Sequence, residues 1–125
     1  MIILLDTNIL LVSVSSRSAK HWVYKEFLAK KYELVVSTEI FLEYEEILGR
    51  FMNHQVAETT TKAIAAAKNT ILITKWYNWN LIEADPDDNK FVDAYIASGA
   101  DYIVTEDSHF DILKTVRFPP VKVIT

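Results

Sequence analysis

Residues 2–8 of the chain read IILLDTN, and this stretch decides the fold class. Four consecutive apolar residues in so short a run are typical of a strand that is buried on both faces. Similar short apolar runs recur at residues 34–37, 70–74, 102–105 and 121–124, and the longer segments between them have helical periodicity. Apolar strands that alternate with helices predict a three-layer α/β/α sandwich with a mostly parallel central sheet.

Four helices are predicted from periodicity and from residues that favour helix N-termini. The predicted ranges are 18–31, 37–52 with Ser37 or Thr38 as the cap, an alanine-rich segment at 55–68, and 88–98. The segment from Ser13 to Ser18 is polar enough to form a loop.

The composition predicts one globular domain over residues 1–125, since half of the residues are hydrophobic and 24% are charged. The two glycines, Gly49 and Gly99, are too far apart to form a glycine-rich phosphate loop or a dinucleotide-binding turn. The absence of cysteine removes disulfides, cysteine-zinc sites and thiol nucleophiles. Any catalysis is therefore expected to use carboxylates, histidines or hydroxyls.

The net charge of −4 gives no overall basic surface, so nucleic-acid binding would need a local basic patch or bridging metal ions. The basic region of note is the first predicted helix, which carries Arg17, Lys20, Lys25, Lys30 and Lys31. No apolar stretch approaches the roughly 18 residues that span a bilayer, and the opening apolar run has no basic segment before it. We expect a soluble, cytoplasmic protein that does not engage a membrane.

Two aspartates follow predicted strands. Asp6 comes directly after residues 2–5, and Asp107 follows residues 102–105 with one residue between. Ligands of parallel α/β sheets bind beyond the carboxyl ends of the strands, which places both carboxylates where a substrate would bind. The alternative is that these are turn and N-cap residues, which Asp, Thr, Asn and Ser favour without any functional reason.

Glu43 is the third candidate, on the helix predicted from about residue 38. The apolar stripe of that helix falls on Ile40, Tyr44, Ile47 and Phe51. Glu43 borders this stripe, whereas Glu39, Glu45 and Glu46 are expected to form a solvated flank. Glu43 is thus the acid of this helix that is predicted to point inward.

The densest acidic stretch is residues 83–93, EADPDDNKFVD. Asp87 and Asp88 have an ordinary explanation as N-terminal residues of the next helix, where negative charge is favourable. However, Asp88 lies on the same side as the aromatic residues three and seven positions later, which turns it toward the sheet. Asp93 falls on the far side of the helix and is kept as the alternative.

Four inward carboxylates would repel one another unless cations or shifted pKa values relieve the repulsion. A divalent metal is the simplest relief, and ligands that are all oxygen suit hard ions such as Mg²⁺ or Mn²⁺. Such ions are usually shared with substrate phosphates, so the implied chemistry is metal-assisted hydrolysis of a phosphodiester bond.

The chain resembles the PIN-domain ribonucleases, a family often found as the toxin of bacterial and archaeal toxin–antitoxin pairs. The resemblance rests on four blocks, DTNIL at 6–10, STEIFLE at 37–43, DPDDNKF at 85–91 and GADYIVTED at 99–107. It implies that Asp6, Glu43, a helix aspartate and Asp107 share one or two Mg²⁺ or Mn²⁺ ions. Counting back from Asp107 without gaps puts the family's helix aspartate at Asn89, whereas the facing argument selects Asp88, which is our prediction.

Other polar and aromatic residues have weaker roles in this prediction. Thr7, Asn8 and Thr105 are candidates to hydrogen-bond the carboxylates, with turn formation as the alternative. The run WYNW at residues 76–79 is a candidate for stacking on unpaired bases, although aromatic residues more often pack in cores or in dimer seams.

The sequence therefore predicts a metal-dependent endoribonuclease that cuts single-stranded or structured RNA, in which a metal-activated water attacks the phosphorus. As the family resemblance implies, it would be the toxin partner of a cognate antitoxin protein; a homodimer is left open. One rival is a phosphoaspartate domain, but such domains carry neighbouring acids or Asp-x-Asp where this chain has Asp6-Thr7-Asn8. The other rival is a catalytically silent interaction module whose acids are caps.

Overall fold

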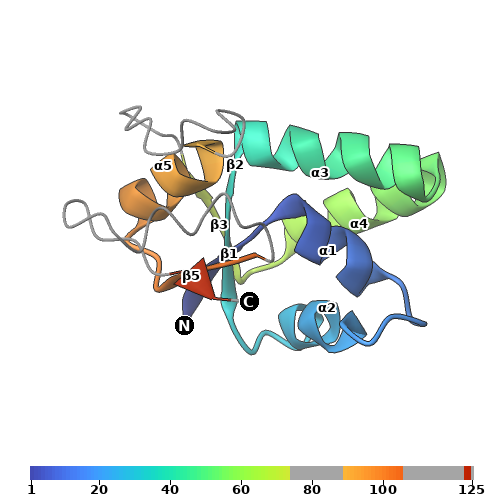
Figure 1. Ribbon diagram of the computed structural model, residues 1–125, viewed down its shortest axis with the longest axis horizontal. Coiled ribbons are helices and arrows are strands. Elements are labelled where there is room, and N and C mark those ends of the chain that lie inside the picture. The colour runs from blue at the N-terminus through green and yellow to red at the C-terminus, as the bar shows by residue number, and fades with distance from the viewer. Residues whose placement is uncertain (74–88, 106–122, 125) are drawn as a thin grey trace.

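The computed structural model describes residues 1–73, 89–105 and 123–124, and its central layer is a parallel sheet (Figure 1). The described strands are β1 (Ile2–Leu5), β2 (Glu33–Ser37), β3 (Thr70–Ile73), β4 (Tyr102–Val104) and β5 (Val123–Ile124). Their order is β3-β2-β1-β4-β5, and each pairing is parallel. The residues that follow the central strands β1 and β4 consequently meet at the same end of the sheet.

Helices cover both faces of this sheet. They are α1 (Thr7–Val14), α2 (His21–Leu28), α3 (Thr38–Phe51), α4 (His54–Ala66) and α5 (Asn89–Ser98). In Figure 1, α5 lies on one side of the strands and α1 to α4 lie on the other. The predicted three-layer α/β/α architecture is confirmed.

The core is centred on β1 and β2. Leu4, Leu34, Val35 and Val36 have no exposed surface, as expected for strands with helices on both sides. Both strands are continuous apolar runs, and their predicted positions agree with the structure to within one residue at each end. Burial of both faces is therefore what the continuous apolar pattern encodes.

Helix α1 is an element that the sequence reasoning missed, because no helix was predicted before residue 18 and Ser13 was expected to start a loop. Ile9, Leu10 and Ser13 are all buried, so this short helix lacks the clean polar face that periodicity analysis needs. The Ser13 hydroxyl donates to the Leu10 carbonyl at 2.8 Å, which satisfies it inside the helix. Because this bond satisfies the Ser13 hydroxyl within the helix, a polar residue at this position does not require a loop.

The other helix boundaries shift by a few residues for local reasons. The helix predicted at 18–31 is confined to α2, and Lys30 beyond it has a left-handed backbone with φ of 61°. The helix predicted at 55–68 begins one residue earlier, because the Asn53 side chain accepts from the Val56 amide at 2.8 Å. The helix predicted at 88–98 is observed as α5, and Asp88 lies outside the described residues.

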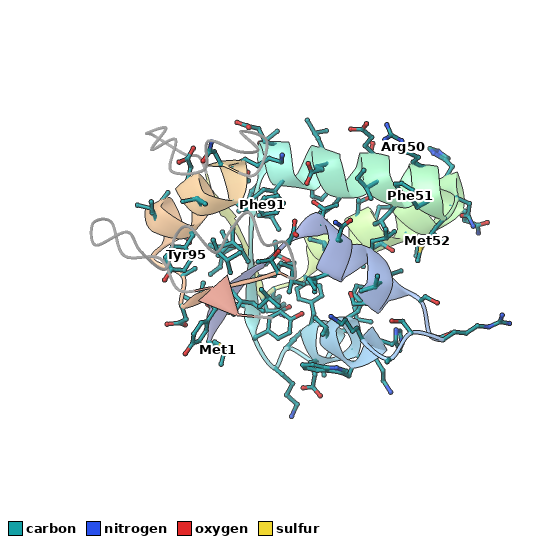
Figure 2. The ribbon with its side chains drawn as sticks, in the orientation of Figure 1. Met1, Arg50, Phe51, Met52, Phe91 and Tyr95 are labelled. Carbon is teal, nitrogen blue, oxygen red and sulfur yellow. The ribbon has the colours of Figure 1, made fainter. Side chains whose placement is uncertain are left out.

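Helix α3 follows its predicted pattern in its first half, but Ile47, which was expected in the apolar stripe, is only half-buried. The Ser37 side chain caps it by accepting from the Ile40 amide at 3.3 Å, as predicted. Ile40, Tyr44 and Leu48 are its buried residues, and the flank of Glu39, Glu45 and Glu46 is exposed as predicted. Phe51 was expected in the apolar stripe but is 64% exposed; Figure 2 shows it with Arg50 and Met52 at the helix end far from α5, where no sheet lies beneath it.

Two helices begin directly after strands, and this arrangement positions the site. Helix α1 starts one residue after β1, and α3 starts immediately after β2. The first residues of both helices thus lie at the carboxyl end of the sheet. Within the described ranges, none of the helices combines the length and the apolar content needed to cross a bilayer.

Candidate active site

Asp6 lies between β1 and α1, with its backbone serving both elements. Its amide donates to the Val104 carbonyl at 2.9 Å, and its own carbonyl accepts from the amides of Ile9 and Leu10 at 3.0 and 3.1 Å. Its side chain makes no capping hydrogen bond to α1. Asp6 as a residue is only 6% exposed, and the capping alternative does not explain why a charged side chain is buried here.

Thr105 holds the Asp6 carboxylate from the neighbouring strand. Its hydroxyl donates to Asp6 Oδ2 at 2.7 Å, and the residue is 1% exposed. Because Thr105 directly follows β4, this bond joins the carboxyl ends of the two central strands. The expectation that Thr105 bonds a carboxylate is confirmed, and the bond fixes the direction in which Asp6 points.

Glu43 points inward from α3, as predicted. Its Oε2 accepts a hydrogen bond from the Thr7 hydroxyl, and its Oε1 forms an ion pair with Lys90 Nζ at 2.9 Å. The Glu43 side chain is 28% exposed and the Lys90 side chain 12%. Thr7, which was expected to bond a carboxylate, does so with Glu43, whereas Asn8 is exposed.

Tyr44 is a buried tyrosine on α3 whose hydroxyl is affected by the charges of both Asp6 and Glu43. Its hydroxyl donates to the Leu5 carbonyl at 2.5 Å, one residue before Asp6. Burial raises the pKa of Tyr44 well above its ordinary value, and the charges of Asp6, Tyr32 and Glu43 raise that pKa further. The charges of Asp6 and Glu43 therefore both favour the neutral form of the same buried phenol.

The sequence reasoning treated Tyr44 as a core residue and missed its polar role. A signal was available, because a buried tyrosine usually finds a partner for its hydroxyl, and this one is adjacent to Glu43. Its hydrogen bond joins α3 to the last residue of β1. Tyr44 thereby holds in register the two elements that carry Glu43 and Asp6.

The burial of residues in helix α5 differs from the prediction at Asp93. Asp93 was placed on the far side of this helix, yet it is only 2% exposed, and Asn89 is 7% exposed. The five consecutive residues from Phe91 to Tyr95 are all buried, so α5 has little solvent-facing surface in this part. The facing argument that favoured Asp88 over Asp93 assumed an amphipathic helix, and that assumption is wrong here.

Several predicted site residues lie outside the described part of the chain. They are Asp87, Asp88, Asp107 and the aromatic run at 76–79. Among the residues that are described, no three acidic, histidine or cysteine side chains gather closely enough to hold a metal ion. The described part of the site thus consists of Asp6 and Glu43, with Thr7, Tyr44, Lys90 and Thr105 around them.

The carboxylate oxygens of Asp6 and Glu43 are the type of donor that Mg²⁺ and Mn²⁺ prefer. Asp6 is buried beside a hydroxyl donor, and Glu43 is partly exposed, which is compatible with a cation that is also reached from solvent. Two carboxylates with oriented hydroxyl partners therefore fit one side of a divalent-ion site.

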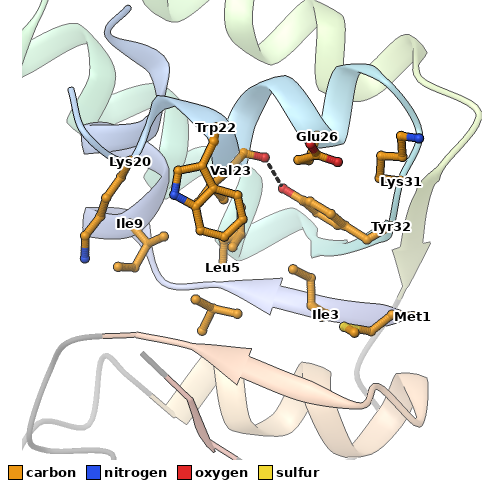
Figure 3. Close-up of a pocket in the computed structure, with 11 residues that line it drawn as sticks. Met1, Ile3, Leu5, Ile9, Lys20, Trp22, Val23, Glu26, Lys31 and Tyr32 are labelled. Carbon is orange, nitrogen blue, oxygen red and sulfur yellow. Dashed lines mark hydrogen bonds between the residues drawn. The ribbon is translucent and has the colours of Figure 1, made fainter. Parts of the chain in front are cut away.

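A separate cavity of about 510 Å³ lies on the α2 side of the sheet (Figure 3). Trp22 and Tyr32 face Ile3 and Leu5 of β1 there, and the Tyr32 hydroxyl donates to the Val23 carbonyl at 2.8 Å. Neither Asp6 nor Glu43 is among the described residues that line it. Its lining is mainly apolar, so it does not contribute to the carboxylate site.

Comparisons with known proteins agree with this architecture. Residues 2–109 match the model of the PIN domain family. No curated protein sequence matches the chain. Solved structures with a similar fold include a toxin described as cleaving the sarcin–ricin loop, VapBC2 bound to promoter DNA, and FitAcB.

The toxin is VapC20 of Mycobacterium tuberculosis, with a TM-score of 0.64 and 15% identity over 87% of this chain and 92% of that one. VapBC2 of Rickettsia felis, bound to a DNA fragment from its promoter, has a TM-score of 0.67 and 18% identity over 98% and 97%. FitAcB of Neisseria gonorrhoeae has a TM-score of 0.60 and 13% identity over 98% and 96%. At these identities the likeness shows a shared fold.

Proposed function

The chain belongs to the PIN domain family, and from this premise we propose that it is a metal-dependent endoribonuclease that hydrolyses RNA phosphodiester bonds. The observation that carries the proposal is the buried Asp6 carboxylate at the carboxyl end of β1. It is held by Thr105, its side chain does not cap α1, and the next residue, Thr7, donates to Glu43. Family membership also separates the chain from phosphoaspartate domains.

In this proposal Asp6 and Glu43 are ligands of Mg²⁺ or Mn²⁺, together with Asp107 and one aspartate of the α5 region. Asp88 is the first choice, as the sequence predicts. Asp93 remains the alternative, because its carboxylate belongs to a residue that is buried rather than directed to solvent. A bound ion of this kind supplies an activated water and stabilises charge on the phosphate oxygens. No side chain needs to act as a covalent nucleophile.

The protein's own groups fix the direction of the carboxylates. Thr105 holds Asp6 in one direction, and Thr7 holds Glu43 from the neighbouring helix α1. Burial, and then the charges of Asp6, Tyr32 and Glu43, raise the pKa of Tyr44, so its hydroxyl stays protonated even above pH 10.0 and keeps donating to the Leu5 carbonyl. The Asp6 side of the site is thus oriented before metal binds, whereas both oxygens of Glu43 already have partners within the protein.

We further propose that the chain acts in the cytoplasm as a single nuclease domain and is the toxin of a toxin–antitoxin pair. Two of the structures that share its fold carry support for this role. One is described as a toxin that cleaves the sarcin–ricin loop, and another, VapBC2, is bound to a DNA fragment from its promoter. Co-purification with the product of the adjacent gene tests the antitoxin partner directly.

The ends of the cleaved RNA test the mechanism. Attack by water at the phosphorus leaves 5′-phosphate and 3′-hydroxyl ends, whereas attack by the RNA's own 2′-hydroxyl leaves a cyclic phosphate. We expect mass spectrometry of a short cleaved oligonucleotide to show the first pair, with activity lost in EDTA and restored by Mg²⁺ or Mn²⁺. Cyclic phosphate ends would rule out the metal mechanism. Absence of both cleavage and metal binding would favour the interaction module.

A further inference from the structure

Lys90 brings a positive charge into the acidic end of the sheet. It is the second residue of α5, and its Nζ lies 2.9 Å from Glu43 Oε1 and 5.4 Å from the centre of the Phe91 ring. Its side chain is 12% exposed, compared with 75% for Lys62, which pairs with Glu58 at 2.7 Å on the surface of α4. The two ion pairs have similar lengths but very different surroundings.

A lysine that is so little exposed is costly to desolvate unless an anion and further contacts compensate it. Glu43 supplies the anion, and the face of the Phe91 ring supplies a weaker electrostatic contact. The pair also joins α3 to α5 across a separation of 47 positions, from residue 43 to residue 90. Lys90 is therefore held in place by the tertiary structure, unlike a flexible surface lysine.

The same contact occupies Glu43. Its Oε1 is taken by Lys90 and its Oε2 by Thr7. A divalent ion that uses Glu43 as a ligand must displace at least part of this arrangement, and the Lys90 ammonium would repel it at short range. A metal ion and Lys90 would thus compete for the Glu43 carboxylate.

We propose that Lys90 is a resident cation of this site that neutralises Glu43 in the metal-free protein and competes with the divalent ion for it. The inference rests on the proposed function in that it takes Glu43 as a metal ligand. Lys90 is then a positioning residue that sets the metal affinity. It limits charge repulsion between Asp6 and Glu43 when metal is absent and moves away from Glu43 when metal binds.

Removing the charge of Lys90 should have two opposite effects. Lys90→Met keeps most of the apolar stem but leaves Glu43 without its ammonium partner, so the metal-free protein should melt at a lower temperature. The same variant should bind Mn²⁺ about tenfold more tightly, because like-charge repulsion is gone. A purely structural lysine would lower the melting temperature without tightening metal binding.

The experiment is calorimetric titration of Mn²⁺ into the full chain, with thermal melts of each protein. Lys90→Arg keeps the charge and should retain an affinity close to that of the unmodified protein. Lys62→Met removes the matched surface pair and should change neither quantity appreciably. Equal or weaker Mn²⁺ binding by Lys90→Met than by the unmodified chain would overturn the inference.

A measurement on the unmodified protein covers the case in which Lys90→Met does not fold. The Lys90 ammonium signal in the ¹⁵N spectrum, assigned by its loss in Lys90→Arg, should shift and exchange faster with water when Mg²⁺ is added. The Lys62 signal should not change. A Lys90 signal that is unaffected at saturating Mg²⁺ would contradict the competition.

The failure of this inference differs from the failure of the proposed function. If the unmodified chain binds Mn²⁺ and cleaves RNA but Lys90→Met binds no more tightly, only the role of Lys90 is wrong. If neither protein binds Mn²⁺, the metal-dependent function fails and the inference fails with it.

Discussion

Two aspartates at opposite ends of the β1–β4 pair illustrate how one residue type serves two purposes. At the amino end, Asp101 Oδ2 accepts from the Ile2 amide at 2.8 Å, and Asp101 is exposed. At the carboxyl end, Asp6 Oδ2 accepts from the Thr105 hydroxyl at 2.7 Å, and Asp6 is buried. Each bond joins the same two segments across 99 positions of the chain.

The two aspartates differ in the free-energy cost of placing a charged carboxylate at each end of the strand pair. Asp101 satisfies a backbone amide at the start of a strand and keeps its charge in water, so it costs little. Asp6 is desolvated and lies near a second acid, so its charge opposes folding unless it is compensated. The comparison indicates that the aspartate at the amino end serves stability, and it supports our proposal that the one at the carboxyl end binds a ligand.

The largest expected effect comes from the same substitution made at both ends. Loss of a group that only orients a metal ligand lowers activity by up to roughly 100-fold. Asp6→Asn removes a proposed ligand itself, so it should lower RNA cleavage by more than this. It should also raise the melting temperature of the metal-free protein, since one charge of a crowded pair is lost. Asp101→Asn should leave cleavage unchanged. An Asp6→Asn protein that is clearly less stable without metal would make Asp6 a structural residue like Asp101.

The next comparison concerns which aspartate near α5 completes the site. Asp88→Asn should abolish Mn²⁺ binding in a calorimetric titration while leaving the melting temperature of the metal-free protein nearly unchanged. Asp93→Asn should alter chiefly the stability, because Asp93 is 2% exposed within a buried helix. A stable Asp93→Asn protein that fails to bind Mn²⁺ beside an active Asp88→Asn protein would transfer the ligand role to Asp93.

A smaller effect is expected when the partner of Asp6 is changed. Thr105→Val keeps the shape of the side chain but removes the hydroxyl that donates to Asp6, so the carboxylate loses a fixed direction. We expect about 10–100-fold weaker cleavage, the usual cost of losing a group that orients a metal ligand. Thr105→Ser, which keeps the hydroxyl, should retain most of the activity. Full activity of Thr105→Val in a cleavage assay would show that Asp6 is oriented without this bond.

The smallest effect at neutral pH is expected from Tyr44, whose contribution to stability changes only at alkaline pH. The pKa of Tyr44 is raised well above 10.0, chiefly by burial and then by Asp6, Tyr32 and Glu43. The unfolded chain releases this proton near pH 10.0, so the stabilisation is fully present below that pH and is lost as the pH rises above it. Urea unfolding at increasing pH should show this decline.

Tyr44→Phe is the matched control for the alkaline decline. It removes the ionisable group and should make the loss of stability above pH 10.0 less steep, while costing about 1 kcal/mol at neutral pH for the lost hydrogen bond. Burial also raises the pKa values of Tyr24 and Tyr32, so part of the decline should remain. An unchanged slope in Tyr44→Phe would mean that Tyr44 does not contribute to the alkaline transition.

The sequence by itself determined the layers of the fold and four of the six residues of the described site, and it missed Tyr44 and Lys90. Continuous apolar runs identified β1 and β2 because burial on both faces removes the need for alternation. Residues directly after these strands had to lie at the carboxyl end of the sheet, which placed Asp6. The 3.6-residue period of α3 separated inward Glu43 from exposed Glu45 and Glu46.

Only the tertiary structure decided the features that depend on contacts between distant segments. Helix α1 and the burial of Asp93 arise from packing around short helices with no clean polar face, so periodicity carried no signal for them. The contacts of Tyr44 with Leu5 and of Lys90 with Glu43 join residues 39 and 47 positions apart. A sequence pattern reports the environment along one element, whereas these partners are brought together by how separate elements pack.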